Sequence, residues 1–533
     1  MKRQIRNWRN TPAMLAAIWA AVWFAFVQVR PAHAQLNELY GFQYNSTTTS
    51  NYPDGETPMA ELIQGADGNY YTTTNGGGTG GCPSTVEGTT EGCGAVVKIT
   101  STGGVSVVYS FPYDSTTNRA ANGLGPQAGL VQGPDGNFYG VTTAGGTEGT
   151  SFCTTAVGIT GCGTIFKLTP AGKVTVLHDF CGPNGCGSLA TDGAVAMGRL
   201  VIGSNGYLYG TTESGGFAEG LYNQGTIFRI SRSGTYEILH LFTGAANTGD
   251  GENPTAGLTF AANGDFYGTT EFGGASGFGT VFKMTPAGTV TVLHSFAEGD
   301  PDGQQPMGAL VQASDGNLYG TCYAGGANNV GTVFRISTSG TFQKLYDFTQ
   351  ATGSVGNLPR AGLIQASDGN LYGTAWESGD GGPGSIYQIT TAGAATLEAT
   401  FNPSSTGFAP LGALVQGDDG RLYVTLSYNG GFNSSDVQDQ GAISVLNLDL
   451  APPLPAIVSF SPTSGAAGTK VKLEFGPYIG ATSVTFNGTS AKYVVEGSEF
   501  ITATVPSGAT SGPISVTTPG GTSTSTKSFT VLP

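Results

Sequence analysis

The nine-residue segment ASDGNLYGT occurs twice in this chain, at residues 313–321 and 366–374, which marks the chain as a repeat protein. Degenerate copies raise the number to seven, at intervals of 68, 70, 58, 52, 53 and 51 residues, centred on Asp67, Asp135, Asn205, Asn263, Asp315, Asp368 and Asp419. Each copy places an Asp-Gly or Asn-Gly pair between two short apolar runs. Both residue types tolerate the positive φ of a tight turn, so every copy predicts a β-hairpin.

Two further elements recur with each copy, which gives four strands, a to d, per repeat. Strand a precedes the hairpin turn and strand b follows it, strand c resembles GTVFKMT (279–285), and strand d resembles VLHSF (292–296). Strand d follows only six of the seven copies, and the seventh, ELYGF, stands at 38–42 ahead of the first repeat. The offset predicts that the N-terminal strand completes the last blade of a ring, because closure removes exposed sheet edges. We therefore expect an all-β, seven-bladed β-propeller over residues 35–450.

The order of these elements, DGNLYGT followed by a Gly-rich loop, GTVFRIS and a strand such as VLHSF, resembles the Gloeo/Verruco (GloVer) tandem repeat of secreted bacterial proteins. The resemblance covers residues 35–450. It implies a β-repeat architecture and an extracellular location, and it implies no particular activity.

A Pro-rich linker, APPLP at 451–455, separates the repeats from a Ser-, Thr- and Val-rich segment at 456–533. That segment contains six or seven short β runs between turn signals, which predicts a small β-sandwich. The motifs SPTSG, GTKV and GATSVTFNG, in this order, resemble bacterial IPT/TIG domains, which are immunoglobulin-like. The resemblance implies a spacer or a binding module on an extracellular protein.

Residues 1–34 have the pattern of a cleaved signal peptide: a basic start, an apolar run and the cleavage motif Ala32-His33-Ala34. A membrane anchor is the alternative, but a run of about 17 residues is at the short end for a span. Five of the 21 basic residues and none of the 36 acidic ones lie in this segment, so the mature chain carries a net charge of −20. This charge argues against nucleic acid and anionic lipid as partners. We expect a secreted, periplasmic or cell-surface protein without a membrane span after cleavage.

Six of the seven cysteines form close pairs in sequence order: Cys82 with Cys93, Cys153 with Cys162, and Cys181 with Cys186. In an exported chain, local disulfides are the expected state of such pairs. The alternative is a metal site, but the Cys-x-x-Cys spacing is absent. Cys322 is left over, as a buried thiol or as an intermolecular partner.

Three histidines of the mature chain, His178, His240 and His294, share one register of strand d in successive repeats. A catalytic histidine would be singular, so the repetition indicates packing or surface positions. The pattern argues against a Ser-His-Asp triad and against a histidine-based metal site.

The remaining candidates for chemistry are acidic residues in the loops from strand d to a and from strand b to c. In an up-and-down sheet these two loops emerge on the same face. The candidate ligand-binding face comprises Asp54, Asp192, Glu213, Asp250, Glu271, Asp302, Trp376 and Glu377. Trp376 is the one tryptophan of the mature chain, and sugars stack on such rings. The alternative is that the Asp-Gly pairs only make turns and the glutamates are solvated.

We expect no cofactor. Calcium is the one candidate considered, but calcium requires clustered oxygen ligands and the chain has no compact Asp-x-Asp-x-Asp loop. The function predicted from the sequence is non-catalytic binding of a glycan or an extracellular protein through the loop face. The alternatives are a polysaccharide lyase or hydrolase that uses these acids, and a structural surface-layer component. The oligomeric state stays open.

Overall fold

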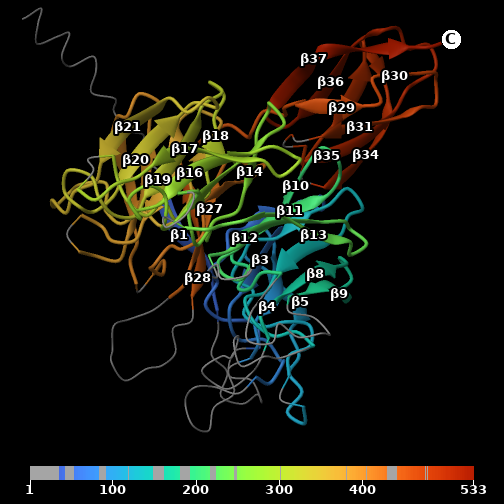
Figure 1. The fold of residues 1–533 in the computed structure, drawn as a ribbon. Coiled ribbons are helices and arrows are strands. Elements are labelled where there is room, and N and C mark those ends of the chain that lie inside the picture. The colour runs from blue at the N-terminus through green and yellow to red at the C-terminus, as the bar shows by residue number, and fades with distance from the viewer. Residues whose placement is uncertain are drawn as a thin grey trace, which may run out of the picture. The chain divides into compact units, whose positions relative to one another are not determined.

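The computed structural model describes residues 35–42, 53–82, 92–117, 119–147, 161–180, 192–216, 224–244, 249–299, 302–379, 381–403, 405–428, 441–474, 476, 478–497 and 499–533 (Figure 1). These residues form β-strands and contain no helix, so the predicted all-β class is confirmed. The predicted signal peptide at 1–34 and the cysteines Cys153, Cys181 and Cys186 lie outside the described residues.

The described residues between 35 and 447 form seven four-stranded antiparallel sheets, which we number sheets 1 to 7. Sheet 1 contains β2 (Ile63–Gln64), β3 (Tyr70–Thr74), β4 (Ala95–Ile99) and β5 (Val105–Ser110); sheet 2 contains β6 (Val131–Gln132), β7 (Phe138–Val141), β8 (Thr164–Leu168) and β9 (Val174–Asp179). Sheet 3 contains β10 (Val201–Ile202), β11 (Leu208–Thr212), β12 (Thr226–Ile230) and β13 (Tyr236–Leu241); sheet 4 contains β14 (Thr259–Phe260), β15 (Phe266–Thr270), β16 (Thr280–Met284) and β17 (Val290–Ser295).

Sheets 5 to 7 repeat this arrangement. Sheet 5 contains β18 (Val311–Gln312), β19 (Leu318–Cys322), β20 (Thr332–Ile336) and β21 (Phe342–Asp347); sheet 6 contains β22 (Ile364–Gln365), β23 (Leu371–Ala375), β24 (Ser385–Ile389) and β25 (Ala395–Thr400). Sheet 7 contains β26 (Val415–Gln416), β27 (Leu422–Leu426) and β28 (Ala442–Asn447), and its fourth strand is β1 (Gln35–Gly41), which pairs antiparallel with β28. The sheets together form a propeller-like β fold.

The tyrosine near the start of every strand b is buried between its own sheet and the next one. Its ring packs on the residue that opens the next strand b: Tyr71 on Phe138 with centroids 4.3 Å apart, and Tyr209 on Phe266 at 4.1 Å. In sheet 7, Tyr423 packs on Tyr70 of sheet 1 at 4.2 Å. Offset aromatic pairs of this kind add to the free energy of burial.

The same tyrosines tie the hairpin turn to strand b. In five sheets the phenol donates a hydrogen bond to the turn aspartate four residues earlier, at 2.7 to 2.9 Å, as from Tyr139 to Asp135. In sheets 3 and 4 the turn residue is asparagine, and its amide donates to Tyr209 or Tyr267 instead. The repeated Asp/Asn and Tyr letters of the sequence therefore specify one turn geometry.

A glutamine at the end of strand a links neighbouring turns in five sheets. In Gln365 of sheet 6, the amide nitrogen donates to the Gly369 carbonyl of its own turn at 2.8 Å. Its amide oxygen accepts the Ser314 backbone N–H of the sheet 5 turn, also at 2.8 Å. Gln64 of sheet 1 accepts the backbone N–H of Asp418 in sheet 7 in the same way, at 3.0 Å. Sheets 3 and 4 carry Ile202 and Phe260 at this position.

Residues 459–531 form two further sheets (Figure 1). The first has the order β29 (Ser459–Ser461), β31 (Lys470–Glu474), β35 (Phe500–Thr504), β34 (Lys492–Gly497); the second has the order β30 (Ser464–Gly465), β37 (Gly521–Val531), β36 (Gly512–Thr518), β32 (Ser483–Phe486), β33 (Thr489–Ser490). Alternating side chains from both sheets, including Val471, Phe486 and Val516, bury one shared apolar cluster. Two sheets that share a core are the arrangement of a β-sandwich.

Replacement of Gln365 by Met should lower the free energy of unfolding by about 1–3 kcal/mol, because two hydrogen bonds of the turn are lost at similar side-chain volume. Urea unfolding followed by tryptophan and tyrosine fluorescence measures the change. Gln343→Met, at an exposed position of β21, is the matched control and should change stability little. Equal stability of Gln365→Met and the wild type would show that this glutamine does not hold the turns together.

Acid should weaken the fold through Asp135. Burial raises the pKa of this carboxyl, but its hydrogen bonds with Lys167, Asn137 and Tyr139 prevail and hold the pKa at about 2. Because the folded-state pKa lies below the unfolded value of about 3.9, ionised Asp135 stabilises the fold above that value and this contribution is lost as the pH falls toward 2. The urea midpoint of Asp135→Asn should therefore be lower at pH 7 and decline less between pH 4 and 2. A decline as steep as that of the wild type would contradict this role.

Candidate functional site

Four of the eight candidate residues, the loop aspartates, are engaged by side chains of strand d. Asp192 lies 3.0 Å from His178, Asp250 lies 2.9 Å from His240, and Asp302 lies 3.8 Å from His294. The hydroxyl of Tyr40 donates a hydrogen bond to Asp54. Two of these histidines are also stacked on rings, His178 on Tyr236 and His294 on Phe342, each at 3.8 Å. These aspartates fix the loop between strands d and a, so we assign them a structural role.

The loop from strand d to the next strand a makes a repeated turn. Leu358 has φ of 54°, and its N–H donates to the Val330 carbonyl of the preceding sheet at 2.9 Å. Val195 has φ of 57° and bonds Cys162 in the same way, although positive φ is unfavourable for a β-branched residue. The recurrence shows that inter-sheet hydrogen bonds impose this backbone. The turn directs the residue two positions later, Arg360 in the case of Leu358, toward a cavity.

This cavity has a volume of about 580 Å³ and is lined by strand a segments of all seven sheets. The residue two positions after the positive-φ turn contributes to its wall in every sheet, and the seven residues are Met59, Gln127, Met197, Thr255, Met307, Arg360 and Leu411. Most of the wall is Ala, Gly, Leu and Val. The volume falls within the roughly 300–1,000 Å³ of small-molecule sites.

Non-repeating residues gather where strand b ends at this side of the sheets. The position four residues after the strand b tyrosine is Asn75, Thr143, Glu213, Glu271, Tyr323, Trp376 and Ser427 in sheets 1 to 7. Together with Arg360, four of these residues form a group that we call the mouth cluster: Glu213, Glu271, Tyr323, Trp376 and Arg360. It comes from sheets 3 to 6 only.

Arg360 is the centre of the mouth cluster. Its guanidinium carbon lies 4.5 Å from the ring centroid of Trp376 and 4.9 Å from that of Tyr323, which are cation–π distances. Its Nε is buried and has no hydrogen-bond partner among the described residues, and neither has the buried hydroxyl of Thr255 in the same cavity wall. Buried donors without partners are costly, so an arrangement of this kind fits a site that a ligand or ordered water completes.

The two glutamates of the mouth cluster influence each other. Burial raises the pKa of Glu213. Burial also raises the pKa of Glu271, and the charge of Glu213 raises it further while Arg360 opposes the shift. The two carboxyls therefore lie close enough for the charge of one to affect the ionisation of the other.

The last candidate is Glu377. In sheet 6, Trp376 occupies the position that Glu213 and Glu271 occupy in sheets 3 and 4, and Glu377 is the next residue. The backbone of Glu377 pairs with Asn357. The structure thus brings Glu213, Glu271 and Trp376 into one cluster and places the aspartates elsewhere. Arg360 and Tyr323 were missed by the sequence analysis. The signal was present, because an arginine replaces Met, Gln, Thr or Leu at one position of seven otherwise uncharged ones.

The cysteine prediction is confirmed for one pair. Cys82 and Cys93 form a disulfide with Cα atoms 5.2 Å apart. Cys162 is also disulfide-bonded, and its predicted partner lies outside the described residues. Cys322 is fully buried.

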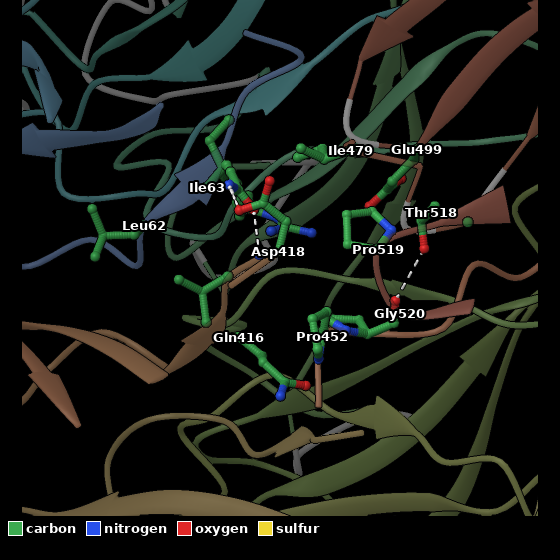
Figure 2. Close-up of a pocket in the computed structure, with 15 residues that line it drawn as sticks. Leu62, Ile63, Gln416, Asp418, Pro452, Ile479, Glu499, Thr518, Pro519 and Gly520 are labelled. Carbon is green, nitrogen blue, oxygen red and sulfur yellow. Dashed lines mark hydrogen bonds between the residues drawn. The ribbon is translucent and has the colours of Figure 1, made fainter. Parts of the chain in front are cut away.

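A second, smaller pocket of about 280 Å³ lies at the opposite ends of the strands, where strand a turns into strand b (Figure 2). Its lining includes Ile63, Gln416 and Asp418 of the sheets and Pro452 and Pro519 from the C-terminal region. Within the described part of the chain, no group of three or more His, Cys, Asp or Glu residues could hold a metal ion. The described residues also include no helix that could cross a membrane.

Comparison with solved structures finds distant likenesses. A fungal alcohol oxidase of the AA5 family, in complex with copper, is 14% identical over 89% of this chain and 97% of that chain, with a TM-score of 0.45. An extracellular domain from B. thetaiotaomicron, described as part of a hybrid two-component system, is 12% identical over 94% and 60%, with a TM-score of 0.44. A luciferin-regenerating enzyme is 14% identical over 60% and 91%, with a TM-score of 0.33.

No curated protein matches the chain. A family model described as the Gloeobacter/Verrucomicrobia repeat matches residues 25–219 and 196–438, which together span well over half of the sequence. The matched residues contain all seven hairpin motifs and the whole mouth cluster. The chain therefore belongs to the Gloeobacter/Verrucomicrobia repeat family.

Proposed function

We propose that this chain is an extracellular, non-catalytic binding protein that recognises a glycan at the mouth cluster. One observation carries the proposal: the side chains that depart from the repeat converge at one end of the shared cavity. A residue that only maintains the fold would recur from sheet to sheet, as the tyrosines and turn aspartates do. Arg360, Tyr323 and Trp376 each occur at their position in one sheet and the glutamate occurs in two, so their convergence calls for another explanation.

The residue types favour a glycan over a protein partner. Sugars present one apolar ring face and an edge of hydroxyl groups, and the cluster offers two aromatic rings beside charged hydrogen-bonding groups. The cavity is concave and mostly apolar with few polar groups, which is typical of small-ligand sites rather than of protein interfaces. Arg360 and the carboxyls can each bind a pair of neighbouring hydroxyls.

The proposal includes a closed ring of seven blades, with β1 as the strand that completes the last blade. Contacts between sheet 7 and sheet 1 support it: Thr425 donates to the Ala60 carbonyl at 2.7 Å, and Gln64 donates to Asp418 at 2.7 Å. An antiparallel pairing of β1 with β28 supports it too. In a closed ring the shared cavity is the central channel.

The same proposal places the protein outside the cytoplasm. The disulfide between Cys82 and Cys93 supports an oxidising compartment. Cleavage of residues 1–34 and the further pairing of the cysteines belong to this proposal. We propose that the C-terminal sandwich is an IPT/TIG-like module.

Substitution of Trp376 by Ala or of Arg360 by Met should each weaken glycan binding about tenfold or more, because a stacking surface or a hydrogen-bonding group is lost. A glycan array that includes neutral and acidic oligosaccharides, followed by calorimetry on the hits, measures binding. Arg421→Met, in the turn between β26 and β27 at the other end of the strands, is the matched control. Binding that survives both substitutions would refute the assignment of the mouth cluster.

A glycan-cleaving activity is the second candidate, and the neighbouring buried carboxyls of Glu213 and Glu271 favour it, since glycosidases use a pair of carboxyls and burial raises the pKa of both. Release of reducing ends or unsaturated sugars in the same samples decides the question. Turnover by the wild type that is lost in Glu271→Gln would replace the non-catalytic proposal. Binding without products would support it.

A further inference from the structure

We propose that the cavity is blind-ended and takes the terminal residues of a neutral glycan chain, which enters past the mouth cluster. This inference rests on the proposed function and adds the class of ligand and its direction of entry. Three features carry it: what lines the far end of the cavity, how tightly the strand a segments approach one another, and the balance of charge along the wall.

The far end of the cavity is lined by the C-terminal region. Val458 and Glu499 contribute to the cavity wall, and Glu499 also lines the smaller pocket beside Asp418 (Figure 2). The next residue, Phe500, is only 1% exposed and belongs to the same buried cluster as Val131 and Ile202.

This attachment coincides with a departure from the repeat. Ile202 occupies the position at which five sheets carry the turn glutamine. The apolar side chain gives up those turn hydrogen bonds and supplies a surface for Phe500 instead. Sheet 3 is therefore specialised to hold the C-terminal region at this end of the cavity.

Among the described residues, the strand a segments that form the wall lie too close together for a lateral exit. A methyl group added to Gly198 would lie 2.7 Å from the backbone nitrogen of Gly257 in the next sheet, and one added to Gly308 would lie 2.8 Å from the backbone of Ala361. Such distances mean that neighbouring strand a segments touch backbone to backbone. Midway along, Arg199 and Glu61 form an ion pair at 3.4 Å across Gly129 of the intervening sheet. A chain that enters at the mouth therefore has to leave by the mouth.

Charge selects a neutral ligand. The cavity and its mouth carry two arginines, Arg199 and Arg360, against four glutamates, Glu61, Glu213, Glu271 and Glu499. Arg199 is paired with Glu61, and Arg360 has Glu271 nearby, so neither cation is available to a uronic acid or a sulfated sugar without competition. The whole mature chain is acidic as well, which disfavours the approach of a polyanion.

The test combines a blocked cavity with defined sugars. The probes are linear malto-, cello-, laminari-, xylo- and manno-hexaoses, together with α-cyclodextrin, which has the glucose units of maltohexaose but no chain end. Ala413→Phe and the milder Ala309→Leu place bulk in the cavity wall away from the mouth cluster. Ala394→Phe, in an exposed turn between β24 and β25, is the matched control, and thermal unfolding confirms that each variant folds.

We expect at least one linear hexaose to bind, Ala413→Phe to weaken its binding about tenfold or more, Ala309→Leu to weaken it less, and Ala394→Phe to leave it unchanged. A cyclodextrin that binds as well as maltohexaose would overturn end recognition. End recognition would also be overturned if Ala413→Phe and Ala309→Leu both bound the hexaose fully while Arg360→Met did not. In that case the mouth cluster remains the glycan site. Binding of acidic glycans alone would overturn the choice of a neutral ligand. If the wild type bound none of these probes and no glycan on the array, the proposed function itself would be refuted.

Discussion

The structure depends on the contact that each strand b tyrosine makes in two directions. The phenol fixes the turn of its own sheet, and the ring packs on the neighbouring sheet, so one side chain carries both the hairpin and the join. A four-stranded sheet with a two-residue strand a has little core of its own. It becomes stable only when its two faces are covered, which is why the apolar clusters lie between sheets rather than within them.

The turn glutamines also connect neighbouring sheets, through hydrogen bonds to backbone groups. Each one serves a carbonyl of its own turn and an N–H of its neighbour's turn, so the loops at that end are ordered as a connected series. At the other end of the strands, the loop aspartates hold the loops between strands d and a through hydrogen bonds with His and Tyr side chains of strand d. Both sets of bonds use residues that recur, whereas the position four residues after the strand b tyrosine carries a different residue in most sheets.

The architecture was predictable because its signals are local. An Asp-Gly or Asn-Gly turn, a tyrosine and an alternating strand can each be recognised within ten residues, and the offset of strand d points to the partner of the N-terminal strand. The roles of the acids were not predictable in this way. Asp192 and His178 are 14 residues apart, and their pairing depends on a loop path that no local pattern reveals. Arg360 and Tyr323 were obscured because each is a single variation in its own repeat, and their contact depends on how sheets 5 and 6 pack.

The position behind strand b has a broader consequence. Seven copies of one backbone site carry Asn, Thr, Glu, Glu, Tyr, Trp and Ser, and the surrounding strands accept all of them with the same register. These seven positions are equivalent in the backbone and differ in side chain. A new recognition surface can arise in such a protein by exchange of side chains at equivalent positions, so sequences with the same repeat would differ in surface chemistry far more readily than in fold.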